Sequence, residues 1–302
     1  FNSTANAFKV TEQPVPGGTW ASINSLNTAR GALQNRGAGT QTEGIVFGGL
    51  EPTISAKTED WNGSAWTEVG DLPQALRSGM GTGSYTSAIT GGGDPGSTKT
   101  AECDTWNGTS WTEVAELNTG RENGGAGGVD NTSAVFFGGG SAAPAFVGNT
   151  ESWDGSTWTE VADLNTARST SAGLGTATAA LAVAGSTPSR TTATEQWDGS
   201  SWTEIAELNS ERVSMGSSGL GVTNALIFGG YNPSSVNSAL TENWNGTSWT
   251  EVNDLGTAKR GGGSIGTSSV GVVFAGGHSP PGVTTDAQEF TASVTNKTIT
   301  VS

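Results

Sequence analysis

The sequence contains few of the side chains on which metal and redox chemistry depends. Among its 302 residues are one cysteine, Cys103, one histidine, His278, and two tyrosines. A lone cysteine excludes an internal disulfide framework. Metal and copper-radical centres take several His, Cys, Tyr or carboxylate ligands gathered in one place, and this inventory is too small to supply them. We therefore expect neither a metal site nor a cofactor.

Basic residues are also scarce, and long apolar runs are missing. Lysine and arginine number 13 against 28 aspartates and glutamates, so the net charge is −15. Such a charge repels the phosphates of nucleic acids and of anionic lipids, and neither is an expected partner. No run of about 18 apolar residues is present to cross a membrane, and Phe1–Val10 lacks the basic and apolar regions of a signal peptide. Because the chain begins at Phe1 and not at methionine, we expect it to be part of a longer polypeptide.

The sequence has an excess of glycine, with 47 residues, and of tryptophan, with 11. Glycine at this level without a three-residue period, together with only 10 prolines, excludes a collagen-like helix. Hydrophobic residues make up only 33% of the chain, yet 11 tryptophans and 9 phenylalanines are too many large apolar groups for a disordered segment. The composition indicates a folded, glycine-rich β protein.

A repeat of about 46 residues runs through nearly the whole chain. Its most regular phrase is W-[N/D]-G-[S/T]-x-W-T-E-[V/I], which occurs five times, with a partial copy near the N-terminus and Phe290 at the first-tryptophan position of the last repeat. A fixed period of this size is the mark of a repeat architecture. The second tryptophans of the copies are Trp20, Trp66, Trp111, Trp158, Trp202 and Trp249.

Each repeat predicts four short β-strands separated by turns. After the tryptophan phrase come a [D/E]-L-N-T-x-R turn, a strand rich in glycine, serine and alanine, and an apolar strand that ends in a glycine pair, as in Leu226–Gly230. The small-residue strand suits the crowded centre of a ring, and the apolar strand should be buried on both faces. We expect each Asn-Gly or Asp-Gly pair to form a type I′ turn between the third and fourth strands. These pairs are Asn62-Gly63, Asn107-Gly108, Asp154-Gly155, Asp198-Gly199 and Asn245-Gly246.

Six such units predict an all-β fold, a six-bladed β-propeller of four-stranded antiparallel blades, because radial stacking covers both faces of each sheet. The propeller should span residues 18–302, and residues 1–17 should form an N-terminal segment that ends an upstream region. We expect Gly18–Leu26 to be the outer strand of the sixth blade, since this segment supplies the tryptophan strand that the last repeat lacks. Lys297–Val301 is a second candidate for that place.

The succession of motifs within each repeat is characteristic. A hydrophobic run ends in Gly-Gly, as in Val135–Gly139, an aromatic residue follows, and a tryptophan comes after a short turn. This succession resembles the repeats of the kelch family of β-propellers over residues 19–302, although the W-N-G-x-x-W spacing is closer than in most kelch repeats. The resemblance implies kelch-like blades. Because kelch propellers include both interaction modules and a few enzymes, it does not specify a function.

The wording of the repeats carries a second resemblance. Phrases such as WNGTSWTEV, DLNTAR and VFFGG lie in a lysine-poor background rich in Thr, Ser, Asn and Gly, and the chain opens with FNSTANAFKV. These phrases resemble structural proteins of tailed bacteriophages, notably cyanophages, and the opening resembles an element of phage fibre proteins. The resemblance implies an extracellular virion module: a non-enzymatic, homo-oligomeric fibre adhesin that binds a glycan on the host surface. The alternative is a capsid or tail decoration protein that docks on other virion proteins, and a polysaccharide-cleaving enzyme ranks third.

Residues that recur in every repeat are expected to hold the blades together. Glutamates recur after each W-T and, in four repeats, two residues before the first tryptophan, whereas a catalytic carboxylate pair should be singular. The arginine of each L-N-T-x-R phrase should pair with a glutamate of an adjacent strand or blade, and the alternative is an anion-binding ring near the channel mouth. The expected structural residues are Arg30, Arg77, Arg121, Arg168, Arg212 and Arg260, with Trp66, Trp111, Trp158, Trp202 and Trp249.

The loops between the second and third strands differ from repeat to repeat, and they should emerge on one face of the propeller. Variable loops on a rigid scaffold are a common way to build a binding surface. These loops are Leu50–Lys57, Asp94–Thr100, Ser141–Asn149, Ser186–Thr194, Tyr231–Ala239 and His278–Asp286. The residues expected to contact a ligand are Asp94, Phe146, Arg190, Tyr231, Asn232 and His278.

Overall fold

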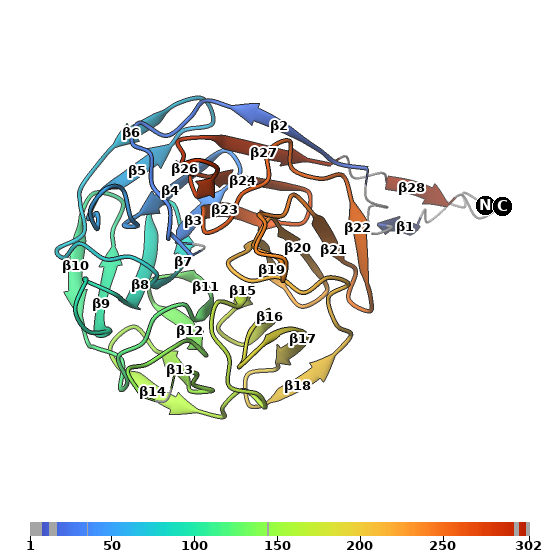
Figure 1. Cartoon of the computed structure of the whole chain (residues 1–302). Coiled ribbons are helices and arrows are strands. Elements are labelled where there is room, and N and C mark those ends of the chain that lie inside the picture. Colours follow the sequence, from blue (N-terminus) through green and yellow to red (C-terminus); the bar gives the residue numbers. More distant parts are fainter. Residues whose placement is uncertain (1–7, 12–16, 35, 144, 293–295, 300–302) are drawn as a thin grey trace, which may run out of the picture.

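A computed structural model of the chain shows a closed ring of six β-sheets, each a four-stranded antiparallel blade (Figure 1). The structure describes residues 8–11, 17–34, 36–143, 145–292 and 296–299, and side chains from residue 17 to residue 292. Its regular elements are all β-strands within those ranges. The predicted all-β, six-bladed propeller is therefore confirmed.

The first five blades are meanders of consecutive strands. Blade 1 consists of β3 (Gly37–Thr40), β4 (Glu43–Phe47), β5 (Thr58–Trp61) and β6 (Trp66–Glu68). Blade 2 consists of β7 (Met80–Ser84), β8 (Ser87–Gly93), β9 (Thr100–Trp106) and β10 (Trp111–Val114). Blade 3 consists of β11 (Gly125–Asp130), β12 (Ser133–Phe137), β13 (Thr150–Trp153) and β14 (Trp158–Val161). Blade 4 consists of β15 (Ala172–Thr176), β16 (Ala179–Ser186), β17 (Arg190–Trp197) and β18 (Trp202–Ile205). Blade 5 consists of β19 (Gly216–Gly221), β20 (Asn224–Phe228), β21 (Thr241–Trp244) and β22 (Trp249–Val252).

The sixth blade joins the two ends of the ring. Its inner strands are β23 (Gly263–Ser268), β24 (Gly271–Ala275) and β27 (Ala287–Thr291), and its outer strand is β2 (Thr19–Ile23), which pairs with β27 so that Trp20 faces Phe290. Residues 19–23, which lie within the expected segment 18–26, thus form the outer strand of the sixth blade. Residues 296–299 form β28 (Asn296–Ile299), which pairs with β1 (Phe8–Thr11) in a separate ribbon outside the ring (Figure 1). A short hairpin of β25 (His278–Ser279) and β26 (Gly282–Val283) completes the strands.

The Asn-Gly and Asp-Gly turns lie where they were predicted, but their type is different. In blade 1, Trp61 faces Trp66, which leaves a four-residue loop in which only Gly63 has positive φ, at 86°. A type I′ turn needs positive φ at both central residues, so that prediction is wrong. The Asn62 side-chain oxygen instead accepts the amide hydrogens of Ser64 and Ala65, a side-chain mimic of a backbone turn.

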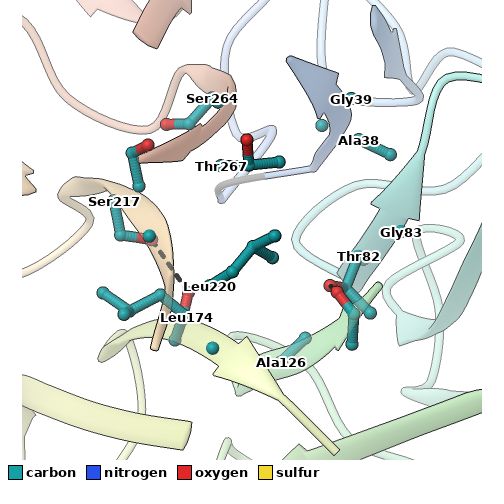
Figure 2. A pocket seen from close by; sticks show the side chains of 18 residues that line it. Ala38, Gly39, Thr82, Gly83, Ala126, Leu174, Ser217, Leu220, Ser264 and Thr267 are labelled. Atoms are coloured by element: carbon teal, nitrogen blue, oxygen red, sulfur yellow. Dashed lines mark hydrogen bonds between the residues drawn. The ribbon is translucent and has the colours of Figure 1, made fainter. Parts of the chain in front are cut away.

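The first strands of the six blades contact one another in a closed ring around the axis. Glycine allows this approach. A Cβ on Gly173 would lie 2.2 Å from the Ala126 amide nitrogen of the neighbouring blade, a distance that no side chain tolerates. Figure 2 shows Leu174, Ser217, Leu220 and other side chains around the resulting channel. The channel holds only about 50 Å³, so it is too small for a sugar ring.

A closed ring of backbone hydrogen bonds ties the blades together at the mouth of this channel. The connecting segment that leads into each blade begins at the leucine of the L-N-T-x-R turn or its equivalent. The residue six positions after this leucine has left-handed φ, between 50° and 62°. Ser78 donates its amide hydrogen to the Ala32 carbonyl, and the bonds continue around the ring at 2.6 to 3.1 Å until Leu33 donates to Gly261. Each blade is thereby fixed to the next independently of side-chain packing. The left-handed residues are Ala32, Ser78, Asn123, Thr170, Ser214 and Gly261.

The second tryptophan of each phrase is a structural residue between blades. Trp66, Trp111, Trp158, Trp202 and Trp249 are all buried. The indole N–H of Trp111 donates to the Thr58 hydroxyl of the preceding blade at 2.9 Å. Trp202 makes the same bond to Thr150. Trp111 and Trp202 therefore contribute both buried apolar area and a polar link to the preceding blade.

Candidate functional site

The recurrent arginines form a buried network with third-strand glutamates. Arg30 donates to the Glu59 carboxylate at 2.8 Å, and both side chains have no exposed surface. The second oxygen of Glu59 accepts the backbone and side-chain N–H groups of Asn27, at 2.7 and 3.0 Å. A buried charge is tolerated when it is paired and further hydrogen bonds compensate for lost hydration. Here the Arg30 Nη atoms and both Glu59 oxygens have partners, and the Arg30 Nε has none among the described residues. The same arrangement recurs as Arg168–Glu195 and Arg212–Glu242. Arg121 and Glu151 form an ion pair at 3.3 Å without a hydrogen bond between them.

Two of the six expected arginines do not belong to this set. Counted from the leucine of the connecting segment, Arg30 and its counterparts lie four residues on, whereas Arg77 and Arg260 lie five residues on. One residue of offset turns the side chain away from the blade, and both arginines are partly exposed on the face that carries the connecting loops. The expectation that all six are equivalent is therefore wrong for Arg77 and Arg260.

The network also shows what the repeated carboxylates do. Glu59, Glu151, Glu195 and Glu242 are buried, form an ion pair with an arginine, and accept hydrogen bonds from the amide groups of an asparagine. Because the guanidinium groups lie inside the protein, they form no anion-binding ring at the channel mouth. These residues are structural in every blade where they occur.

The loop face is the side of the propeller on which the second strand connects to the third and each blade connects to the next. On this face, Tyr231 follows the glycine pair of blade 5 and is held by backbone bridges to Val213 and Asn237. Both neighbouring blades send an arginine to its ring. Arg260 lies with its guanidinium carbon 3.8 Å from the ring centroid, and that of Arg190 lies 5.2 Å away.

Hydrogen bonds fix the blade 6 side of this arrangement. Arg260 donates from Nη1 to the Asn237 side-chain oxygen at 3.0 Å, and the Asn237 amide nitrogen donates to the His278 carbonyl at 2.7 Å. The backbones of Arg260 and His278 bridge each other. The Tyr231–Arg260 stack is thus supported by three loops, which limits the entropy lost when a ligand binds.

Two cavities adjoin this stack. One, of about 430 Å³, is lined by Tyr231, Arg260 and His278 together with Val236 and the Pro280-Pro281 pair. The other, of about 580 Å³, has Arg190, Glu211 and Pro233 in its wall. Cavities of several hundred Å³ with a few placed polar groups are the usual form of small-ligand sites. The candidate site consists of these two cavities and five residues, Arg190, Tyr231, Asn237, Arg260 and His278. We call it the Tyr231 cleft.

The electrostatics of the cleft favour anions locally. A hydrogen bond from Ser235, followed by the charges of Arg260 and Arg190, lowers the pKa of Tyr231. Burial, followed by the Arg260 charge, lowers the pKa of His278, so this histidine is neutral at neutral pH and adds no charge. The two guanidinium groups therefore carry the positive charge of the site.

The structure brings together four of the six residues expected to contact a ligand. Arg190, Tyr231 and His278 belong to the Tyr231 cleft, and Asn232 is the next residue after the tyrosine. Asp94 lies in blade 2, where it is buried and accepts two bonds from Arg77, and Phe146 lies half-buried in the blade 3 loop. Neither reaches the cleft.

The sequence analysis did not place Arg260 and Asn237 in the site. The sequence does distinguish Arg260 from the buried arginines, because Arg260 lies five residues after Leu255 and the buried arginines lie four residues after their leucine. Asn237 has no such signal, since its importance comes from a bond to Arg260 of the next blade.

Comparison with known proteins does not extend this description. The chain matches no protein-family model and no curated protein. In the described part of the chain, no three His, Cys, Asp or Glu side chains are grouped so that they could hold a metal ion. No helix among those same residues has the length and apolar character needed to cross a membrane.

Proposed function

We propose that this propeller is a non-enzymatic virion module, a phage fibre adhesin whose loop face binds a glycan on the host surface. The observation that carries the proposal is the Tyr231 cleft itself. Three consecutive blades contribute one side chain each to a single aromatic centre, Arg190, Tyr231 and Arg260, beside two cavities of sugar size. Aromatic and planar polar groups of this kind are suited to sugar rings.

The distribution of variation around the ring supports a binding role. The order of connecting turn and four strands recurs in every blade, and the outer-strand phrase W-T-E-[V/I] recurs in five, whereas the loops on the loop face differ between blades in length and sequence. The buried third-strand glutamates already interact with arginine and asparagine, which is a reason to propose binding without catalysis. A single shallow site binds weakly, and a homo-oligomeric fibre would gain avidity by presenting several copies.

A decoration protein that docks on other virion proteins is the second candidate, and one feature favours it. The opposite face, which carries the tight hairpin turns, has a hollow of about 320 Å³ with Tyr85, Val129 and Leu220 in its wall. Val129 and Leu220 are 42% and 37% exposed. Apolar side chains that gather around a hollow are more typical of a protein contact than of a sugar site.

The test is binding of the purified propeller to a panel of bacterial surface polysaccharides, with release of reducing ends assayed in the same wells. We expect saturable binding without release. The chain offers a matched pair of variants, because its two tyrosines lie on opposite faces: Tyr231→Ala should abolish binding and Tyr85→Ala should leave it unchanged. Release of reducing ends would show that the protein is an enzyme and would overturn the proposal. If the natural protein binds none of the polysaccharides, docking on virion proteins would be favoured instead.

A further inference from the structure

Most of the lysines and arginines whose side chains the structure describes are paired with a carboxylate, some inside the fold and some at its surface. Side chains are described for 11 of its 13 lysines and arginines, since Lys9 and Lys297 lie outside that range. Eight of the 11 have a carboxylate within 4.0 Å, and Arg36 is fully buried against backbone carbonyls. Within this part of the chain, the cations that are solvent-accessible and outside any ion pair are Arg190 and Arg260.

These two arginines are not scattered on the surface. They come from blades 4 and 6, and both reach Tyr231 of the blade between them. The ring keeps two like charges close together, and cation–π contact with its face offsets part of their repulsion. A protein with a net charge of −15 that holds two unpaired guanidinium groups around one aromatic ring has a local positive site in a negative field.

Arg260 also has the geometry of a preorganised donor. Its Nη1 donates to the Asn237 side-chain oxygen, and its guanidinium carbon lies 3.8 Å from the centroid of the Tyr231 ring, so the side chain is held in place before a ligand arrives. Guanidinium groups are suited to oxyanions because their N–H groups form two parallel bonds to carboxylate, sulfate or phosphate. Arg190 lines the adjoining cavity, and Glu211 is another lining residue of that cavity.

We infer that the ligand of the Tyr231 cleft is a polyanionic glycan whose oxyanion groups are bound by Arg190 and Arg260. The inference rests on the proposed glycan-binding function and names its substrate class. The part of the polymer that crosses blades 4 to 6 must carry either one acidic group for each arginine or a single acidic group that both arginines bind. Neutral polysaccharides of the same backbone bind much more weakly, because nothing then pairs with the two charges.

The experiment uses one polymer in two forms: polygalacturonate and the same material after carboxyl reduction to the neutral polymer. Dissociation constants are measured by biolayer interferometry between 20 and 300 mM NaCl. We expect carboxyl reduction to weaken binding at least tenfold at low salt, and binding of the acidic form to weaken as salt rises. Dextran sulfate and a polyglycerol phosphate are further arms that show whether sulfate or phosphate replaces carboxylate.

Matched variants assign the effect to the two arginines. Arg190→Gln and Arg260→Gln should each weaken binding of the acidic polymer about tenfold, and Arg77→Gln, the same charge change on the same face, should not. Arg190→Lys should restore part of the affinity, which a purely structural role would not do. Thermal unfolding of each variant controls for folding.

Three outcomes decide the question. Equal binding of the acidic and reduced polymers overturns the polyanion inference and leaves the glycan-binding proposal standing. Failure to bind any polymer of the panel, neutral or acidic, overturns both. The inference is also overturned if Arg77→Gln weakens binding of the acidic polymer as much as Arg190→Gln does. Binding would then depend on the total charge of the protein, and Arg190 and Arg260 would have no special role.

Discussion

Four blades of this propeller and the other two differ in the polar side chains that link the connecting segment to the third strand. In blades 1, 3, 4 and 5 the connecting segment supplies an asparagine and an arginine to a third-strand glutamate. In blades 2 and 6 all three positions change at once. Blade 2 has Pro73, Leu76 and Asp104, and blade 6 has Gly256, Lys259 and Gln288. A buried charge without a partner is costly, so the members of such a network are replaced together.

In blade 2 the buried cation is supplied by the neighbouring blade 1. Arg36 of blade 1 is fully buried and donates to the carbonyls of Leu76 and Gly92, on either side of the space that the arginine of blade 2 would fill. Burial lowers the pKa of Arg36 to about 10, which leaves it charged at neutral pH. Asp104 stands where the other blades have glutamate, without a direct bond from Arg36.

Blade 6 uses a shorter cation. Lys259 donates to the Phe274 and Asp286 carbonyls and pairs with the Asp286 carboxylate at 3.0 Å. The Gln288 side-chain oxygen takes over one task of the glutamate, since it accepts the amide hydrogens of Gly256 and Thr257. A neutral glutamine at this position leaves no buried charge unpaired, because Lys259 forms its ion pair with Asp286.

The largest difference between the two groups of blades should appear when a regular network is broken. Glu242→Gln in blade 5 leaves the buried Arg212 without a counter-charge, and we expect the free energy of unfolding to fall by about 3–5 kcal/mol. The midpoint of urea unfolding measures this loss. Glu251→Gln, on the exposed face of the adjacent outer strand, is the matched control and should change stability by less than about 0.5 kcal/mol. Similar effects for both variants would show that the buried pair has no special weight.

A smaller effect, opposite in sign, is expected at the altered network of blade 2. Burial is the main cause that raises the pKa of Asp104 to about 6. The folded carboxyl therefore holds its proton more tightly than the unfolded one, and stability falls as the pH rises from about 4 through 6. Asp104→Asn removes this dependence and should be more stable than the natural protein at pH 8, by on the order of 1–3 kcal/mol, with little difference at pH 4.

Thermal unfolding at several pH values between 4 and 8 tests this prediction. Glu204→Gln, an exposed carboxyl at the outer strand of blade 4, serves as the control and should leave the pH profile unchanged. If Asp104→Asn destabilises the protein at pH 8, the attraction between Asp104 and Arg36 outweighs the cost of burial, and blade 2 resembles the regular blades after all.

The smallest effect concerns the link between blades 2 and 3. Trp111, Trp202 and Trp20 each donate to a threonine hydroxyl of the preceding blade, but at the matching place Trp158 faces Cys103, and its indole nitrogen has no oxygen partner. Cys103→Thr should supply the missing acceptor and raise the free energy of unfolding by about 0.5–1.5 kcal/mol.

Cys103→Val is the natural control, because valine has the shape of threonine without the hydroxyl. The urea midpoint should rise for threonine and not for valine. A gain of equal size in both variants would assign the effect to strand propensity and packing and not to the hydrogen bond.

Much of the architecture could be predicted from short stretches of sequence. The tryptophan phrase, the glycine pair and the small-residue strand indicated four strands per unit and their order from the centre outward. Even the irregular repeats keep the backbone of the others: Ala184 of blade 4 has the left-handed φ, 52°, that glycine has elsewhere. The hydrogen bond from Gly185 to the Arg212 carbonyl is 3.4 Å, against 2.8 or 2.9 Å in the other blades. One methyl group is thus accommodated without loss of the turn.

The errors arose where position relative to a neighbour mattered. Arg77 and Arg260 were grouped with the buried arginines although a count from the preceding leucine separates them. No pattern within one repeat indicates that Arg36 fills a space in the next blade, because its partners are backbone carbonyls about 40 and 56 residues away. The same limit applies to Asp94 and Phe146, which lie on the expected face but far from the cleft.

The sequence by itself determined the repeat, the number of blades, the strand that closes the ring and the face that varies. These features depend on hydrogen-bonding and hydrophobic patterns within about 46 residues. Only the tertiary structure decided which side chains meet: Arg190 with Arg260 at Tyr231, and Arg36 with blade 2. Closure of the ring sets the angle between adjacent blades, and that angle, which no single repeat contains, determines which loops of neighbouring repeats come within bonding distance.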